Sequence, residues 1–216
     1  MALSKVNFNS INATPTASKF VTFNSDADGL AAGDVGGSLT LLSTTTVTSS
    51  TDGIEITSNL NSTYKEYIFK FINLHPVTDG TSWQFQASTD SGSSFGINKV
   101  STFIEATHNE DDSGTGLAYN TTFDRGANST DFITLISEIG SDADQSGSGT
   151  LHLFNPSGTT FTKNYIARTS SSSNANNQRD QYIAGYFNTT SAIDALRFET
   201  RSGNLETGVL KMYGVS

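Results

Sequence analysis

The chain has 216 residues, of which 35% are hydrophobic and only 15% are charged, and it contains 14 Phe and 7 Tyr but no Cys. A net charge of −9 without a cluster of basic residues argues against nucleic acid binding, and the lack of Cys excludes disulfides and thiolate metal sites. Because Ser, Thr and Gly accompany spaced aromatic residues, we predict an all-β fold: an antiparallel β-sandwich, jelly-roll-like, with an extended N-terminal arm.

The N-terminal sequence, MALSKVNFNS, lacks the apolar core of a signal peptide, and no apolar run reaches the length of a membrane span. We therefore expect the protein to be made in a cytosol and not to insert into a membrane. No cofactor motif is present, so we expect no cofactor.

Residues 1–45 differ from the rest of the chain because they contain few aromatic residues and long stretches of small ones. This pattern predicts an extended arm for attachment or oligomerisation, followed by a β-sandwich domain at residues 46–216. A first strand with loops of the same sandwich is the alternative. If residues 1–45 form an arm, we expect four apolar residues to dock on a partner: Val6, Phe8, Phe20 and Phe23.

The strand signals become regular after residue 46. Residues 53–57 alternate after an Asp-Gly turn, and residues 64–74 form the strongest strand. Tyr67, Phe69 and Phe71 share one face of it, and Ile68, Ile72 and Leu74 share the other, which predicts a central strand buried on both sides. Residues 83–87 are expected beside it across a turn at 79–80, with Gln84 and Gln86 outward. Further strands are predicted at 98–106, 131–137, 149–154, 161–168, 181–187, 193–200 and 207–213, with a polar loop at 170–180.

Residues 88–95 match the S-x-D-x-G-x-x-[WF] pattern of an Asp-box, in which the carboxylate of Asp90 caps a hairpin turn and Gly92 supplies a permissive backbone angle. The copy is single, so the pattern predicts a structural turn and not a sialidase propeller. Asp142 and Asp144 resemble the first half of a calcium loop, but Leu153 stands where the closing Glu belongs. A polar turn is the competing interpretation, and we assign no metal site.

Exposed aromatic residues could stack on sugars, and Tyr119 and Tyr182 are the candidates for such contacts. Trp83 alternates with Phe85 and is expected in the core. Glycoside hydrolysis needs two carboxylates across a cleft, and no pair of glutamates is distinguished from the others by its spacing. No nucleophile elbow, Walker loop or zinc motif is present, so we predict that the protein is not an enzyme.

Several segments resemble a family of virion structural proteins from marine tailed bacteriophages that infect cyanobacteria and pelagic bacteria. The resembling segments are ALSKVNFNS, STYKEYIFKFINLHPVTDGTSWQFQASTDSGSSF, LHLFNPSGTTFTK, AGYFNTTSAIDALRFETRSGNLETG and LKMYGVS. Tyr64, Tyr67 and the closing Tyr213-Gly214 look characteristic. The resemblance implies synthesis in the cytoplasm of a bacterial host and a place on the exterior of the virion rather than a mechanism, and it brings no catalytic residues with it.

The leading hypothesis is therefore a non-enzymatic exterior virion protein, either a capsid decoration protein or a head or tail appendage, that binds other capsid or tail components. By analogy with phage appendages we expect a homo-oligomer, with a trimer favoured. The alternative is a carbohydrate-binding, lectin-like module of a tail fibre that contacts host surface glycans.

Overall fold

The computed structural model describes residues 20–23, 30–33 and 39–215, which belong to two units, Met1–Ser38 and Leu39–Ser216. In the first unit, β1 (Phe20–Phe23) pairs antiparallel with β2 (Leu30–Gly33). The boundary differs from the predicted one, because residues 39–45 pair with the last strand of the sandwich. Of the predicted anchors, Phe20 and Phe23 are the ends of β1, while Val6 and Phe8 lie outside the described residues.

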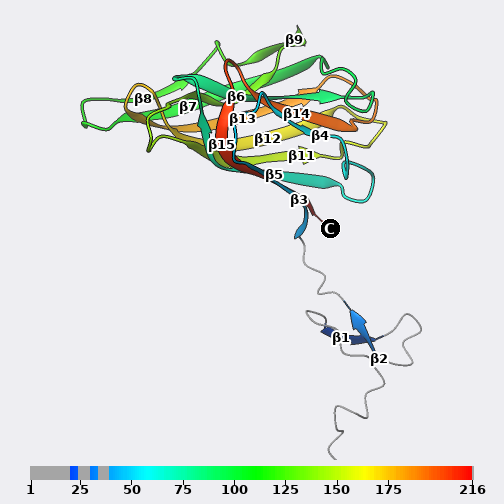
Figure 1. The fold of residues 1–216 in the computed structure, drawn as a ribbon. Helices are drawn as coiled ribbons and strands as arrows, with labels where there is room; N and C mark the ends of the chain where they lie inside the picture. Colours follow the sequence, from blue (N-terminus) through cyan, green and yellow to red (C-terminus); the bar gives the residue numbers. More distant parts are fainter. Residues whose placement is uncertain (1–19, 24–29, 34–38, 216) are drawn as a thin grey trace, which may run out of the picture. The chain divides into compact units, whose positions relative to one another are not determined.

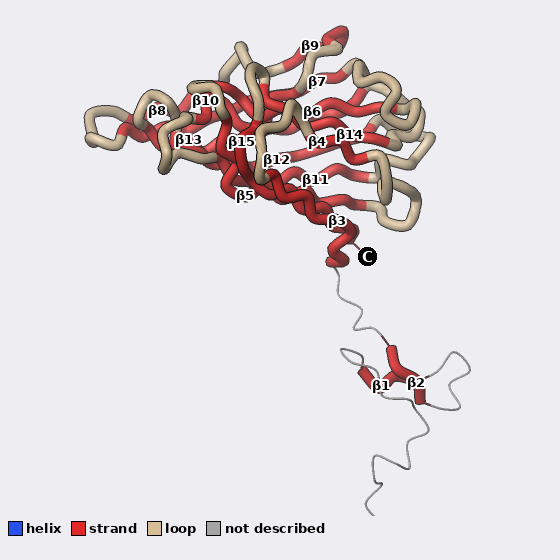
Figure 2. Tube along the Cα trace, viewed as in Figure 1, coloured by secondary structure: helices blue, strands red, loops and turns tan. Residues whose placement is uncertain are grey.

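The second unit is an antiparallel β-sandwich of two sheets (Figures 1 and 2), as predicted. The larger sheet has nine strands in the order β3-β15-β5-β11-β12-β13-β7-β8, and β9 also pairs with β7. Its strands are β3 (Leu39–Val47), β5 (Glu66–Pro76), β7 (Lys99–Asn109), β8 (Thr115–Tyr119), β9 (Arg125–Ser129), β11 (Gly147–Phe154), β12 (Lys163–Ser172), β13 (Asn177–Phe187) and β15 (Leu205–Val215). The smaller sheet has the order β10-β6-β14-β4, with strands β4 (Ile54–Ile56), β6 (Thr81–Ser88), β10 (Ile133–Ile139) and β14 (Ala195–Thr200).

Alternation of buried and exposed residues shows how the larger sheet is oriented. Along β12, every second residue from Lys163 to Ser171 is buried, and those between them are exposed. Side chains of successive residues point to opposite faces of a strand, so this sheet has one inner and one outer face.

The predicted central strand lies in the interior of the larger sheet as β5, between β15 and β11. The prediction that it is buried on both sides is wrong, because Tyr67, Phe69 and Phe71 are buried whereas Lys70 and Ile72 are exposed. Leu74 was expected to share a face with Ile72, yet it is buried. Asn73 has a φ of 50°, and this local departure from strand geometry returns Leu74 to the inner face.

The predicted neighbour of β5 belongs to the other sheet. After β5, the chain passes into the smaller sheet, where β6 pairs with β10 and β14. All eight residues of β6 are buried, so the expected outward exposure of Gln84 and Gln86 is also wrong. The side chain of Gln86 donates to the carbonyl of Thr130 at 2.7 Å, which shows that a loop covers this face.

Most of the remaining predicted strands are present within a few residues of their expected bounds. Within the sandwich, three strands were not predicted: β3, most of which falls in the expected arm, and the short exposed strands β8 and β9. The strands β1 and β2 of the first unit were not predicted either. The predicted polar loop at 170–180 is wrong at both ends, because β12 continues to Ser172 and β13 begins at Asn177. Cross-strand pairing to two neighbours overrides the low apolar content of this stretch.

Aromatic rings fill the space between the sheets. The ring of Phe198 from β14 lies 5.4 Å from Phe69 and 6.2 Å from Trp83, measured between centroids. Phe85 from β6 meets Tyr165 of the opposite sheet edge-on at 5.3 Å. Burial of each such side chain contributes about 1.5–3 kcal/mol, so this cluster is the main source of contact between the sheets. Trp83 is a core residue, as expected.

Candidate functional site

The outer face of the larger sheet carries a row of exposed side chains that crosses four strands. Ile104 on β7 is paired on one side with Tyr119 on β8 and on the other side with Tyr182 on β13. Tyr182 is paired in turn with Arg168 on β12. Paired residues of neighbouring strands project from the same face. We call these four residues the outer row. Tyr119 and Tyr182, two separate candidates in the sequence, therefore lie on one surface with Ile104 between them.

A shallow hollow of about 350 Å³ lies on the outer face along the part of this row formed by Ile104, Tyr182 and Arg168, and Tyr119 lies outside it. The small side chain of Ala184, which lies between Thr102 and Ile166 on the neighbouring strands, is part of its lining. The hollow is lined mainly by apolar atoms, and its lining includes Ile104, Ile166, Tyr182 and Ala184 together with Arg168 and His152. Three of its large hydrophobic side chains are exposed: Ile104 (40%), Tyr182 (43%) and Ile166 (48%).

Carboxylates hold both tyrosines of the outer row in place. The hydroxyl of Tyr182 donates to Asp180 at 3.1 Å, and Arg168 donates to the same carboxylate through Nε at 3.1 Å and Nη2 at 2.9 Å. These bonds from Arg168 lower the pKa of Asp180. The guanidinium also lies over the Tyr182 ring, 4.9 Å from its centroid.

The hydroxyl of Tyr119 donates to Asp124 at 2.8 Å, and this bond raises the pKa of Tyr119. Both rings are thus fixed before any ligand arrives. The sequence did not indicate Arg168, Asp180, Asp124 or Ile104, because strand register alone brings them next to the tyrosines. Alternation within each strand indicates which residues share a face, but not which strands are neighbours.

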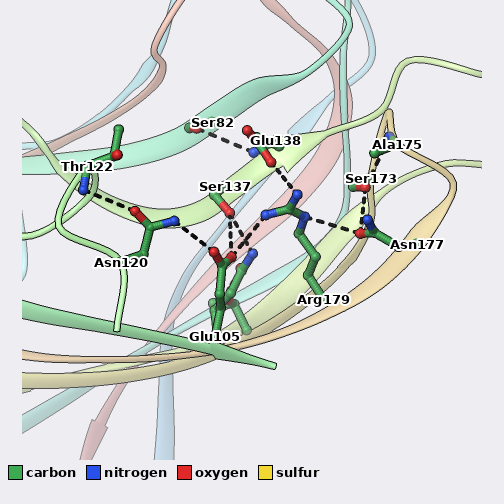
Figure 3. A network of polar contacts seen from close by, with 12 residues as sticks. Ser82, Glu105, Asn120, Thr122, Ser137, Glu138, Ser173, Ala175, Asn177 and Arg179 are labelled. Atoms are coloured by element: carbon green, nitrogen blue, oxygen red, sulfur yellow. Dashed lines mark hydrogen bonds and ion pairs between the residues drawn. The ribbon is translucent and has the colours of Figure 1, made fainter. Parts of the chain in front are cut away.

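A second polar cluster, the interior ion network, lies between the sheets (Figure 3). The guanidinium of Arg179 from β13 donates to the carboxylate of Glu105 from β7 at 2.9 Å and also contacts Glu138 from β10. Asn120 donates to the other oxygen of Glu105 at 2.7 Å. Ser137 lies 3.5 Å from the carboxylate and accepts a bond from Gln181 at 2.9 Å.

The interior ion network joins one strand of the smaller sheet to two strands of the larger one. Glu138 has a φ of 51° and lies where the pairing of β10 with β6 is irregular, so a bulge positions its side chain toward Arg179 (Figure 3). Glu105 and Glu138 share the same guanidinium. Both carboxylates are therefore explained by their ion pairs with Arg179, which connect the two sheets.

The Asp-box forms a compact turn, as its pattern predicts. The carboxylate of Asp90 accepts bonds from the backbone of Ser94 at 2.9 Å and from the hydroxyls of Ser88 and Ser94, both at 2.6 Å. These bonds lower the pKa of Asp90 to about 2. Gly92 has a φ of 84°, which suits glycine. The turn does not close a hairpin, however, because it leads from β6 in one sheet to β7 in the other.

Asp142 and Asp144, the calcium candidates, are both exposed at a polar turn. The backbone N–H of Asp142 donates to the side chain of Gln145 at 3.1 Å, and its carbonyl accepts from the Gln145 N–H at 2.8 Å. Within residues 20–23, 30–33 and 39–215, no group of three or more His, Cys, Asp and Glu side chains gathers as a metal site would require. The polar turn accounts for both aspartates.

One edge of the larger sheet is long and uncharged. Among the described strands, β3 pairs only with β15, and its nine residues, LTLLSTTTV, include no charged residue and no proline. Leu39 and Leu41 are exposed on it. The other edge strands of the sandwich are shorter: β4, β8, β9 and β10. An exposed edge presents unpaired N–H and C=O groups that can pair with another chain.

Comparison with known proteins gives no family for this chain: no family model, curated protein or solved structure matches it. In the part of the chain that the structure describes, no helix is long and apolar enough to cross a membrane.

Proposed function

We propose that the chain is a non-enzymatic structural protein on the exterior of a tailed-phage virion, where it acts by assembling with copies of itself and with other capsid or tail proteins. The observation that carries the proposal is the open edge of β3. Strands that must remain unpaired are usually short or carry charges, proline or bulges that block pairing. The nine residues of β3 carry no charge and no proline, and the one irregularity in its pairing with β15, between Leu41 and Ser43, leaves residues 43–47 as a regular open edge.

Charge supports pairing at β3 in particular. The chain has a net charge of −9, so contact between copies is opposed by repulsion over much of the surface. Antiparallel pairing of two β3 strands brings no like charges opposite each other, and it adds main-chain hydrogen bonds along the edge. By contrast, the edge strand β4 carries Glu55 in an ion pair with Arg197.

The place in a virion rests on the sequence resemblance, with which a cysteine-free β-sandwich agrees. In this proposal residues 1–38 attach the sandwich to a neighbouring protein, and β3 follows directly as the strand that pairs. Antiparallel pairing of β3 with β3 relates two copies by a twofold axis and by itself forms a dimer, so the trimer expected by analogy with phage appendages would rest on a different contact between copies.

The test is a charged substitution on the open edge, Thr46→Lys, with Thr46→Gln as a matched uncharged control. We expect the purified full-length chain to sediment as an oligomer, Thr46→Lys to shift it to the monomer, and Thr46→Gln to leave it unchanged. Incorporation into virions, measured by quantitative mass spectrometry of purified particles, should fall with Thr46→Lys and with deletion of residues 2–38. Oligomerisation and incorporation that are the same in all variants would contradict the proposal.

A further inference from the structure

We infer that the outer face of the larger sheet binds an extended, neutral glycan, which lies along the outer row across β8, β7, β13 and β12. This inference goes beyond the assembly proposal and is independent of it. Assembly depends on the edge strand β3, whereas the glycan site depends on side chains at the face of strands near the opposite edge. Three properties of the site support the inference: its spacing, its apolar floor and its polar rim.

The spacing of the two aromatic rings suits a chain of sugars. Tyr119 and Tyr182 are both register partners of Ile104, so their strands are separated by one intervening strand. Two interstrand spacings are about 10 Å, which is close to the length of two sugar rings in an extended chain. Alternate sugars of one chain can therefore stack on Tyr119 and on Tyr182, with the intervening sugar over Ile104.

The floor of the hollow matches the apolar faces of sugar rings. The C–H groups of a pyranose form apolar patches that pack on aromatic and aliphatic side chains, and Ile104, Ile166 and Tyr182 offer such surface in the open. Ala184 leaves room beside them. A hollow of about 350 Å³ is at the small end of the range for ligand sites. It accommodates part of a longer chain that continues over Tyr119.

The polar groups of the site are oriented for hydroxyls and are nearly balanced in charge. Arg168 uses two of its five N–H donors on Asp180, and the remaining donors are available to a ligand. The carboxylates of Asp180 and Asp124 keep further acceptor sites beside the rings. Because Arg168 is already paired and the whole chain is acidic, an anionic glycan would be repelled, so a neutral chain is the better fit.

The experiment measures binding of the full-length chain to neutral oligosaccharides by isothermal titration calorimetry. The probes are hexasaccharides of β-1,4-linked glucose, mannose and N-acetylglucosamine, together with their disaccharides and an acidic hexamer of galacturonic acid. We expect at least one neutral hexasaccharide to bind more tightly than its disaccharide, and the acidic hexamer to bind more weakly than that chain.

Three variants and a control locate the site. Tyr182→Ala should weaken hexasaccharide binding at least about tenfold, as loss of a central aromatic contact does. Ala184→Leu should weaken it by filling the hollow while leaving both rings in place. Tyr119→Ala should weaken the hexasaccharide but not the disaccharide. Phe161→Ala removes an exposed aromatic residue outside the row and should change nothing.

Failure of every neutral hexasaccharide to bind at millimolar concentration would overturn the inference, as would binding that Tyr182→Ala and Ala184→Leu leave unchanged. Stronger binding of the acidic hexamer would overturn its neutral character. If Tyr182→Ala instead abolishes self-association in sedimentation experiments, the face is a contact between copies and the glycan inference is wrong. Loss of association in Thr46→Lys alone would leave glycan binding intact, so the two proposals can fail separately.

Discussion

The two sheets of the sandwich differ in how many of their faces are covered. In the smaller sheet, every residue of β6 and six of the seven residues of β10 are buried, so both faces are covered over these two strands, while Glu55 on the edge strand β4 is exposed. In the larger sheet, strands such as β12 bury only alternate residues, and one face is open. The smaller sheet is thus a structural layer, whereas the larger sheet has a surface on which a ligand can be bound.

Polar residues play different parts in the two sheets. On the smaller sheet, the side chain of Gln86 is fully buried, and loop carbonyls such as that of Thr130 accept its hydrogen bonds. On the outer face of the larger sheet, Arg168 and Asp180 pair with each other in the open. A buried polar group must form its hydrogen bonds within the protein, whereas an exposed ion pair can form hydrogen bonds with a ligand instead.

The largest expected effect concerns the aromatic cluster between the sheets. Phe198→Ala removes a fully buried ring that contacts both layers, and we expect the free energy of unfolding to fall by about 3–5 kcal/mol. Tyr182→Ala, on the open face, should cost about 1 kcal/mol or less. Urea unfolding followed by Trp83 fluorescence measures both. Equal losses of unfolding free energy in the two variants would show that the outer face is also covered in the folded protein.

The next effect compares two arginines that both form ion pairs. The side chain of Arg179 is 11% exposed and that of Arg168 is 66% exposed. Arg179→Met leaves Glu105 buried without its partner, and we expect a loss of about 3 kcal/mol in the free energy of unfolding. Arg168→Met should leave that free energy nearly unchanged. A similar loss in both variants would contradict the distinction between inner and outer faces.

A smaller effect, visible only in its pH dependence, concerns Lys99 on the inner face. Burial, and secondarily the nearby Arg125, lowers the pKa of Lys99 to about 8. Between that value and 10.5, the value for an unperturbed lysine, the unfolded state holds more protons than the folded state. Lys99 therefore contributes a penalty that is present below pH 8 and is relieved as the pH rises toward 10.5.

The measurement is urea unfolding of the natural chain and of Lys99→Met from pH 5 to pH 10. We expect the difference between the two free energies to be constant from pH 5 to pH 7. Above pH 8 the natural chain should gain stability relative to the variant. A difference that stays flat up to pH 10 would show that the Lys99 ammonium is well solvated in the folded state.

Local patterns in the sequence predicted much of the sandwich. Alternation of apolar and polar residues indicated β5 and most later strands, and the Asp-box indicated the turn after β6. The errors arose where neighbours decide the outcome. Gln84 and Gln86 were expected to be exposed because nothing in their own strand shows that a loop folds over them. Leu74 was assigned to the wrong face because Asn73 interrupts the alternation at a point that composition does not reveal.

The candidate site divides in the same way. The sequence by itself determined the acidic charge, the all-β class, and the presence of two tyrosines with the means to contact a sugar, because these follow from composition and local periodicity. Only the tertiary structure decided that Tyr119 and Tyr182 lie on either side of Ile104, that Arg168 and Asp180 join them, and that Glu105 meets Arg179 and Glu138. The physical reason is that strand order and register are set by packing between residues far apart in the chain, which no local pattern encodes.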